Sequence, residues 1–164
     1  MRSITFLLLD VDGVLTDGRI TYTSDGLESK SFHVRDGLGI VALRNQGCRV
    51  GIITGRSSPV VGRRAKELGI DEIHQGAEDK LRVYAALKQK HGLTDREVAF
   101  IGDDEPDLGV LRCVGFSAAP ADAHESVKKA VMYVCKHRGG EGAVREIVDL
   151  ILAAGSNRGR RGSQ

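Results

Sequence analysis

The sequence has no long apolar run, few cysteines and little net charge. No stretch approaches the ~20 apolar residues that span a membrane, and the apolar run at 4–9 leads into Asp10 and Asp12 instead of a small-residue cleavage site. Cys48, Cys113 and Cys135 are odd in number and widely spaced, which favours neither a disulfide framework nor a zinc site. We therefore expect a cytoplasmic protein with no membrane partner.

Charge and length narrow the class of protein further. The formal net charge is +2, and residues 156–164 carry three arginines, so the rest of the chain is close to neutral and no nucleic-acid partner is expected. At 164 residues the chain has room for one compact domain, which we place at residues 1–154. Residues 155–164 are rich in Gly, Ser and Arg, a composition typical of a disordered tail.

Strand-like runs alternate with helical segments along the chain. The expected strands are residues 4–9, 49–54, 72–74, 98–101, 115–118 and 133–135, and the expected helices are residues 37–45, 59–68, 80–91, 107–114, 123–130 and 142–154. Two β-prone stretches, 20–22 and 29–32, flank Ser24-Asp25-Gly26 and predict a hairpin after the first strand. The alternation predicts an α/β fold with a doubly wound, mostly parallel, Rossmann-like sheet.

Several polar residues lie just after predicted strands. Asp10 and Asp12 follow the first strand, Thr54 the second, and Asp103 and Asp104 the strand at 98–101. Ligands of open parallel sheets bind outside the carboxyl ends of the strands. We therefore expect these five side chains to converge on one crevice.

Asp10 and Asp12 can divide the work of a phosphoryl transfer. One carboxylate can attack phosphorus to form an aspartyl-phosphate, while the other protonates the departing alcohol and later activates water. In this interpretation Asp10 attacks and Asp12 moves the proton. Taken alone, an Asp-x-Asp-Gly run is equally well a solvated turn.

A second acidic loop and a set of donors accompany this pair. Oxygen ligands from the loop at 102–107 and from the first acidic loop suit Mg²⁺, which also offsets repulsion among the carboxylates. The Thr54 hydroxyl, the Gly55 amide and the Arg56 guanidinium can reach phosphate oxygens, and Lys80 can supply a fixed positive charge. The competing interpretations are a Thr54 that caps a helix and a Lys80 that faces solvent.

Taken in order, these motifs resemble the four signatures of the haloacid dehalogenase superfamily of phosphatases. The resemblance spans residues 4–152, and it is strongest to the small 3-deoxy-D-manno-octulosonate 8-phosphate phosphatases, because the segments at 32–37 and 138–146 resemble their patterns too. The motifs are Asp10-Val11-Asp12-Gly13, Thr54-Gly55-Arg56, Lys80 and Gly102-Asp103-Asp104 with Asp107.

This resemblance implies a role for each matching residue. Asp10 is the nucleophile and a metal ligand, Asp12 is the acid/base and binds Mg²⁺ through its carbonyl, and Asp103 is the third ligand. Thr54 and Lys80 orient and neutralise the phosphoryl group. Asp104 and Asp107 support the metal site, and the residues implied to bind substrate are Asp12, His33, Val34, Arg35, Asp36, Gly37, Gly55, Arg56, Arg64 and Lys80.

The same resemblance implies an assembly and a pathway. Small members of this family lack a cap domain and form homotetramers in which the hairpin of one subunit closes a neighbour's site. The sequence agrees, because no interval between the motifs has room for a cap. The implied pathway is lipopolysaccharide synthesis.

Three positions depart from the family pattern and leave the sugar acid open. Glu105 and Pro106 replace an apolar and a varied residue, and Glu141 stands where many octulosonate phosphatases have Arg. The rival substrate is a nonulosonate 9-phosphate, although Arg56 suits pairing with a substrate carboxylate and favours the octulosonate.

Two hypotheses come from other classes of protein. A receiver-type phosphoacceptor module also clusters Asp, Thr and Lys near Mg²⁺, but its lysine follows the last strand, whereas Lys80 precedes the second acidic loop. A catalytically silent oligomeric partner with the same fold is the other alternative.

Overall fold

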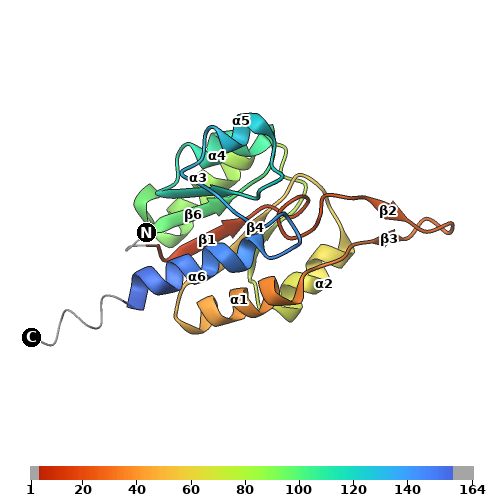
Figure 1. The fold of residues 1–164 in the computed structure, drawn as a ribbon, viewed down its shortest axis with the longest axis horizontal. Helices are drawn as coiled ribbons and strands as arrows, with labels where there is room; N and C mark the ends of the chain where they lie inside the picture. Colours follow the sequence, from red (N-terminus) through yellow and green to blue (C-terminus); the bar gives the residue numbers. More distant parts are fainter. Residues whose placement is uncertain (1–3, 157–164) are drawn as a thin grey trace, which may run out of the picture.

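The computed structural model describes residues 4–156, which fold around one parallel sheet (Figure 1). The six strands run in the order β5-β4-β1-β6-β7-β8, and every pairing is parallel. The order reverses between β1 and β6, so the crevice of a doubly wound fold is expected there. The strands are β1 (Phe6–Leu9), β4 (Arg49–Ile53), β5 (Glu72–His74), β6 (Val98–Ile101), β7 (Phe116–Ala119) and β8 (Tyr133–Val134).

Helices cover both faces of this sheet (Figure 1). One face carries α1 (Val34–Asn45), α2 (Pro59–Glu67) and α6 (Ala143–Ser156), and the other carries α3 (Lys80–His91), α4 (Leu108–Leu111) and α5 (Glu125–Lys128). Two 3₁₀ turns, η1 (Asp95–Glu97) and η2 (Glu105–Asp107), flank β6. Within residues 4–156 no helix is long and apolar enough to cross a membrane.

The position of β1 between the two layers of helices explains why its sequence is apolar throughout. Leu7 and Leu9 pack into the core under α1 and α6, whereas Phe6 and Leu8 pack into the core under α3 and α4. Successive side chains of a strand point to opposite faces, so a strand buried on both faces is apolar throughout. The predicted doubly wound sheet is confirmed.

Five of the six helices begin or end at residues other than the predicted ones, and the differences at α1 and α4 are the largest. The first helix begins at Val34 instead of residue 37. Gly37 is an interior residue of this helix, and because it has no side chain, Arg64 of α2 can approach it closely. The predicted helix at 107–114 is η2 followed by the single turn α4, since the chain then turns so that the Gly115 amide donates to the Asp95 carbonyl. The last helix runs through Ser156, and the rest of the predicted tail, residues 157–164, lies outside the described residues.

The predicted hairpin is present and projects from the body of the protein (Figure 1). Its strands, β2 (Thr21–Tyr22) and β3 (Glu28–Ser29), pair antiparallel, and Gly26 takes a positive φ of 82° in the turn. Tyr22 is 61% exposed and Leu27 is 65% exposed. A single chain therefore leaves large apolar side chains of this hairpin in water.

The loop before α6 holds the loop that follows β1. The Gly140 amide donates to the Val14 carbonyl at 3.0 Å, and a Cβ at Gly139 would collide with the Gly13 carbonyl. Asp122 accepts a hydrogen bond from the Gly139 amide at 2.9 Å and so fixes this loop in turn. Two adjacent glycines are needed because the two backbones touch.

Candidate active site

A crevice of about 490 Å³ opens at the carboxyl ends of β1, β4 and β6. It lies where the strand order reverses, as the topology requires. The structure brings nine of the predicted residues together here, namely Asp10, Asp12, Thr54, Gly55, Arg56, Lys80, Asp103, Asp104 and Asp107.

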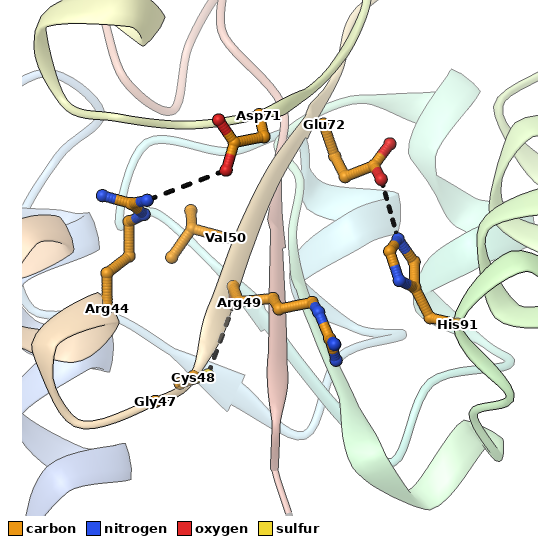
Figure 2. A pocket seen from close by; sticks show the side chains of 8 residues that line it. All are labelled: Arg44, Gly47, Cys48, Arg49, Val50, Asp71, Glu72 and His91. Atoms are coloured by element: carbon orange, nitrogen blue, oxygen red, sulfur yellow. Dashed lines mark hydrogen bonds and ion pairs between the residues drawn. The ribbon is translucent and has the colours of Figure 1, made fainter.

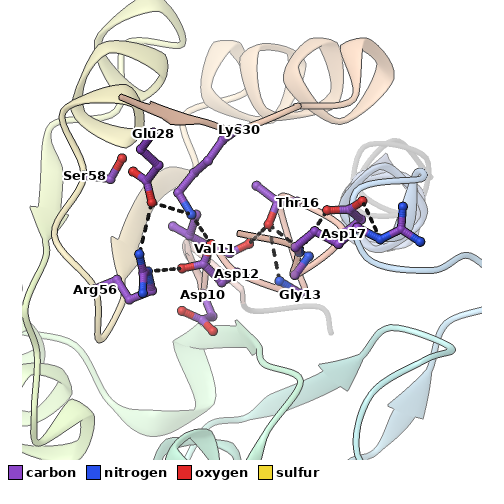
Figure 3. Close-up of polar contacts among 12 residues, drawn as sticks. Asp10, Val11, Asp12, Gly13, Thr16, Asp17, Glu28, Lys30, Arg56 and Ser58 are labelled. Atoms are coloured by element: carbon purple, nitrogen blue, oxygen red, sulfur yellow. Dashed lines mark hydrogen bonds and ion pairs between the residues drawn. The ribbon is translucent and has the colours of Figure 1, made fainter. Parts of the chain in front are cut away.

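The tight loop after β1 aims the first two carboxylates at different neighbours. The Val11 carbonyl accepts hydrogen bonds from the amides of Leu15 and Thr16, at 2.9 and 3.1 Å, and the buried Val11 side chain anchors the turn. As Figure 3 shows, the Asp12 carboxylate faces Lys30 and Arg56, and Asp10 lies apart from them. The arrangement is therefore a structured loop and not a solvated turn.

Lys80 lies between two buried carboxylates. Its Nζ is 3.0 Å from Asp10 Oδ1 and 2.6 Å from Asp107 Oδ1, and all three side chains are buried. Asp79 caps α3 by accepting from the Arg82 amide, which places Lys80 in the first turn. The interpretation of Lys80 as a solvent-facing lysine is thus wrong.

Burial and neighbouring charges shift the pKa values of Asp10, Lys80 and Asp103. Burial raises the pKa of Asp10, Asp107 raises it further, and Lys80 opposes both. Burial lowers the pKa of Lys80, but Asp10 and Asp107 together raise it above its ordinary value. Burial, Asp10 and Asp107 likewise raise the pKa of Asp103. Three carboxylates facing one ammonium leave an excess of negative charge that a divalent cation would balance.

The residues present fit a hard divalent cation. Asp10, Asp103 and Asp107 each place a carboxylate oxygen within 4.8 Å of the others. Asp103 Oδ1 is buried without a hydrogen-bond partner among the described residues. Asp103 can come this close to the β1 loop because Gly13, at a φ of 88°, has no Cβ to block its Oδ2. Oxygen donors of this kind suit Mg²⁺.

Asp107 organises the acidic loop. Its Oδ2 accepts hydrogen bonds from the amides of Asp103 at 2.9 Å and Asp104 at 3.3 Å, and its Oδ1 is taken by Lys80. The Asp104 side chain accepts from the Glu105 amide and caps η2. Because both Asp107 oxygens are engaged, the carboxylates left to hold a cation are those of Asp10 and Asp103.

Donors that follow β4 line the other side of the crevice, and one of them, Arg56, contacts the hairpin. The Thr54 amide donates to the His74 carbonyl at 2.9 Å, and the N-cap position of α2 is Ser58, so Thr54 is not the helix cap. Arg56 Nη2 lies 3.2 Å from both Tyr22 Oη and Glu28 Oε1. The hairpin therefore reaches its own chain's crevice.

Glu28 and Lys30 are crevice neighbours that sequence reasoning missed. Lys30 Nζ donates to Asp12 Oδ1, and its side chain is 1% exposed. The signal available was weak: two opposite charges two residues apart in an extended segment share one face.

Six predicted substrate residues lie away from this crevice. His33 and Arg35 line a separate cavity of about 460 Å³ beside the start of α6, and Val34 is exposed. Arg64 packs against Gly37 and over the Phe32 ring, 5.7 Å from its centroid.

Asp36 is the sixth residue of this group, and its side chain faces inward. It is almost fully buried, and its Oδ1 accepts a hydrogen bond from the Arg145 amide at 2.7 Å in the first turn of α6. Burial raises its pKa. In this chain the carboxylate supports the helix instead of facing a ligand.

A further cavity lies at the opposite edge of the sheet, where β4 begins (Figure 2). Its acidic residues are paired, Asp71 with Arg44 at 3.8 Å and Glu72 with His91 at 2.8 Å. Glu72 also pairs with Lys90 at 2.6 Å, so Arg44 and Lys90 balance the acidic charge of this cavity, which is remote from the crevice.

Comparison with known proteins identifies the family. A family model described as haloacid dehalogenase-like hydrolase matches residues 33–115. The chain is also 44% identical to the 3-deoxy-D-manno-octulosonate 8-phosphate phosphatase KdsC of Haemophilus influenzae over 154 residues, 94% of this chain and 86% of that protein. This chain belongs to the haloacid dehalogenase-like hydrolases. The membership expected from the motifs is confirmed.

Solved structures of hydrolases from this family share the fold. A 3-deoxy-D-manno-octulosonate 8-phosphate phosphatase from Moraxella catarrhalis, in complex with a magnesium ion, a phosphate ion and a KDO molecule, matches with a TM-score of 0.93 and 47% identity over 95% of this chain and 90% of that chain. The cobalt-bound enzyme of Haemophilus influenzae matches with a TM-score of 0.91 and 44% identity over 94% and 91% of the two chains.

The acidic cluster of this hydrolase predicts a specific response to Mg²⁺. At a concentration about 100 times Kd, Mg²⁺ should stabilise the folded protein by ~2.7 kcal/mol and raise the melting temperature by about 5–10 °C. Asp103→Asn should remove this shift yet melt no lower than wild type without Mg²⁺, because it relieves carboxylate repulsion. Calorimetry measures both values.

Asp71→Asn is the matched control, since its side chain is exposed and lies at the far edge of the sheet. It should keep the full Mg²⁺ shift. An Asp103→Asn variant that keeps the wild-type shift would contradict the assignment of the cation to this cluster.

Proposed function

We propose that the protein is a Mg²⁺-dependent phosphatase that hydrolyses 3-deoxy-D-manno-octulosonate 8-phosphate to the free sugar acid and phosphate. The observation that carries this proposal is the meeting of Asp10, Asp12, Thr54, Lys80 and Asp103 in one crevice. The relatives named for this activity support it, and one of them binds magnesium, phosphate and KDO. They do not favour the nonulosonate alternative.

The reaction proceeds in two displacements on phosphorus. Asp10 attacks the phosphorus atom, the bond from phosphorus to the sugar oxygen breaks, and Asp12 gives its proton to that oxygen. Asp12 then takes a proton from water as the water oxygen attacks the aspartyl-phosphate and releases phosphate. The free sugar acid and phosphate are the products.

The neighbouring residues make Asp10 a competent nucleophile. Lys80 keeps the buried Asp10 ionised and offers positive charge to the phosphoryl oxygens, while Thr54 and the Gly55 amide orient them. Asp10, the Asp12 carbonyl and Asp103 hold Mg²⁺, which neutralises the phosphoryl charge when bound. Asp107 and Asp104 support this set through the hydrogen bonds of the acidic loop.

The remaining substrate residues act in an assembly. The protein is a cytoplasmic homotetramer in which the hairpin and the start of α1 meet neighbouring subunits. The apolar exposure of Tyr22, Leu27 and Val34 supports such contacts, since large apolar surfaces of this kind are usually covered. His33, Val34, Arg35, Arg56 and Arg64 bind the sugar acid, with His33, Val34, Arg35 and Arg64 serving the crevice of a neighbouring subunit, while Asp36 and Gly37 hold the start of α1 in place. The pathway served is lipopolysaccharide synthesis.

Phosphate release from a panel of esters tests the proposed activity. The panel holds the octulosonate 8-phosphate, a nonulosonate 9-phosphate and hexose phosphates, each with Mg²⁺ and with chelator. We expect Mg²⁺-dependent turnover with at least ~10-fold higher kcat/KM for the octulosonate than for any other ester. Preference for the nonulosonate would change the substrate, and release of no phosphate from any ester would leave the silent-partner hypothesis.

A charged residue at the hairpin tip tests the assembly. Leu27→Glu should reduce the sedimenting species from four chains to one or two, because a carboxylate would be buried in an apolar contact. Folding should survive, since Leu27 is exposed in the single chain. Met132→Glu places the same charge on another exposed apolar residue and should leave the assembly intact. Unchanged sedimentation of Leu27→Glu would remove the hairpin tip from the interface.

A further inference from the structure

Four charged side chains form a closed ring at the edge of the crevice (Figure 3). Lys30 Nζ contacts Asp12 Oδ1 and lies 3.6 Å from Glu28 Oε1. Arg56 Nη2 lies 3.2 Å from the same Glu28 oxygen, and its Nε is 3.8 Å from Asp12 Oδ2. Each cation thus lies between two carboxylates, and the four formal charges cancel.

Burial distinguishes this ring from a set of surface ion pairs. The Lys30 side chain is almost completely excluded from water, and those of Glu28 and Asp12 are 13% and 20% exposed. A lysine side chain is almost never fully buried unless its ammonium is paired with an opposite charge. Because Glu28 and Lys30 are two residues apart at the end of β3, both side chains point the same way, toward Asp12 and Arg56 (Figure 3).

We propose that Lys30 is a positioning residue for Asp12 and that Glu28 holds Lys30 and Arg56 in place. This inference rests on the proposed function. Lys30 occupies Asp12 Oδ1 and so fixes the plane of the carboxylate. Oδ2, which Arg56 Nε approaches only to 3.8 Å, is then the oxygen that exchanges the proton with the leaving sugar oxygen. The base of the hairpin therefore belongs to the active site of its own subunit, and this role does not depend on which subunit the hairpin tip contacts.

Two phosphate esters with different leaving groups separate this role from a structural one. A sugar alkoxide leaves only when it is protonated, whereas 4-nitrophenolate leaves without a proton. The ratio kcat/KM reports the steps up to the first release of the alcohol, so later hydrolysis of the aspartyl-phosphate does not affect it.

Lys30→Met keeps the apolar stem and removes the donor. With Mg²⁺ present, we expect kcat/KM to fall ~100-fold for the octulosonate 8-phosphate and less than ~3-fold for 4-nitrophenyl phosphate. Lys30→Arg retains a donor and a positive charge and should recover at least half of the loss on a logarithmic scale. Lys66→Met removes one exposed positive charge on α2 and should match wild type with both esters.

The outcomes separate this inference from the proposed function. Equal losses with both esters, in a Lys30→Met variant that melts at the wild-type temperature, would overturn the positioning role, and so would wild-type rates with both. If Lys30→Met melts lower than wild type, Lys30→Arg is measured in its place, and equal fractional losses of kcat/KM with both esters in that variant would overturn the positioning role. A wild-type chain that releases phosphate from neither ester would overturn the proposed function and this inference with it.

Discussion

The bridge from the Lys80 ammonium to Asp10 and Asp107 is the interaction on which the rest of the site depends. It joins the ends of β1 and β6 to the start of α3, the three elements that meet where the strand order reverses. A buried carboxylate without this partner would take up a proton and lose its nucleophilicity. Asp107 also accepts hydrogen bonds from the amides of Asp103 and Asp104, which shape the acidic loop. A change in the charge of Lys80 or Asp107 would therefore also change the geometry of this loop.

Much of the fold could be predicted because its causes are local or periodic. The strand at 6–9 is apolar since both its faces are covered. The rule that ligands lie at the carboxyl ends of parallel strands predicts that Asp10, Asp12, Thr54, Asp103 and Asp104 share one crevice, and all five line it. The sequence pattern places the start of the first helix at Gly37, whereas α1 begins at Val34 and contains Gly37 in its interior. Its reason for being glycine is the approach of Arg64, a tertiary contact that no local pattern contains.

The site was predicted less completely where it depends on packing between distant segments. Glu28 and Lys30 follow a turn that any hairpin can have, and their contact with Asp12 and Arg56 depends on how the hairpin leaves the body. Residues 33–37 and Arg64 were assigned to substrate through family resemblance, and in one chain they lie outside the crevice. The periodicity of a single sequence does not show where subunits meet. The substrate-binding roles of residues 33–37 and Arg64 therefore stay predictions.

The central claim is that Asp10 receives the phosphoryl group within this balanced cluster. The most direct measurement is acid quenching of Asp12→Asn during reaction with 4-nitrophenyl phosphate, followed by mass spectrometry of its peptides. This variant should form the aspartyl-phosphate and hydrolyse it slowly, because the leaving group needs no proton but the water needs a base. The account predicts phosphate on the peptide that contains Asp10. Phosphate on another residue, or release of nitrophenol with no phosphorylated peptide, would contradict it.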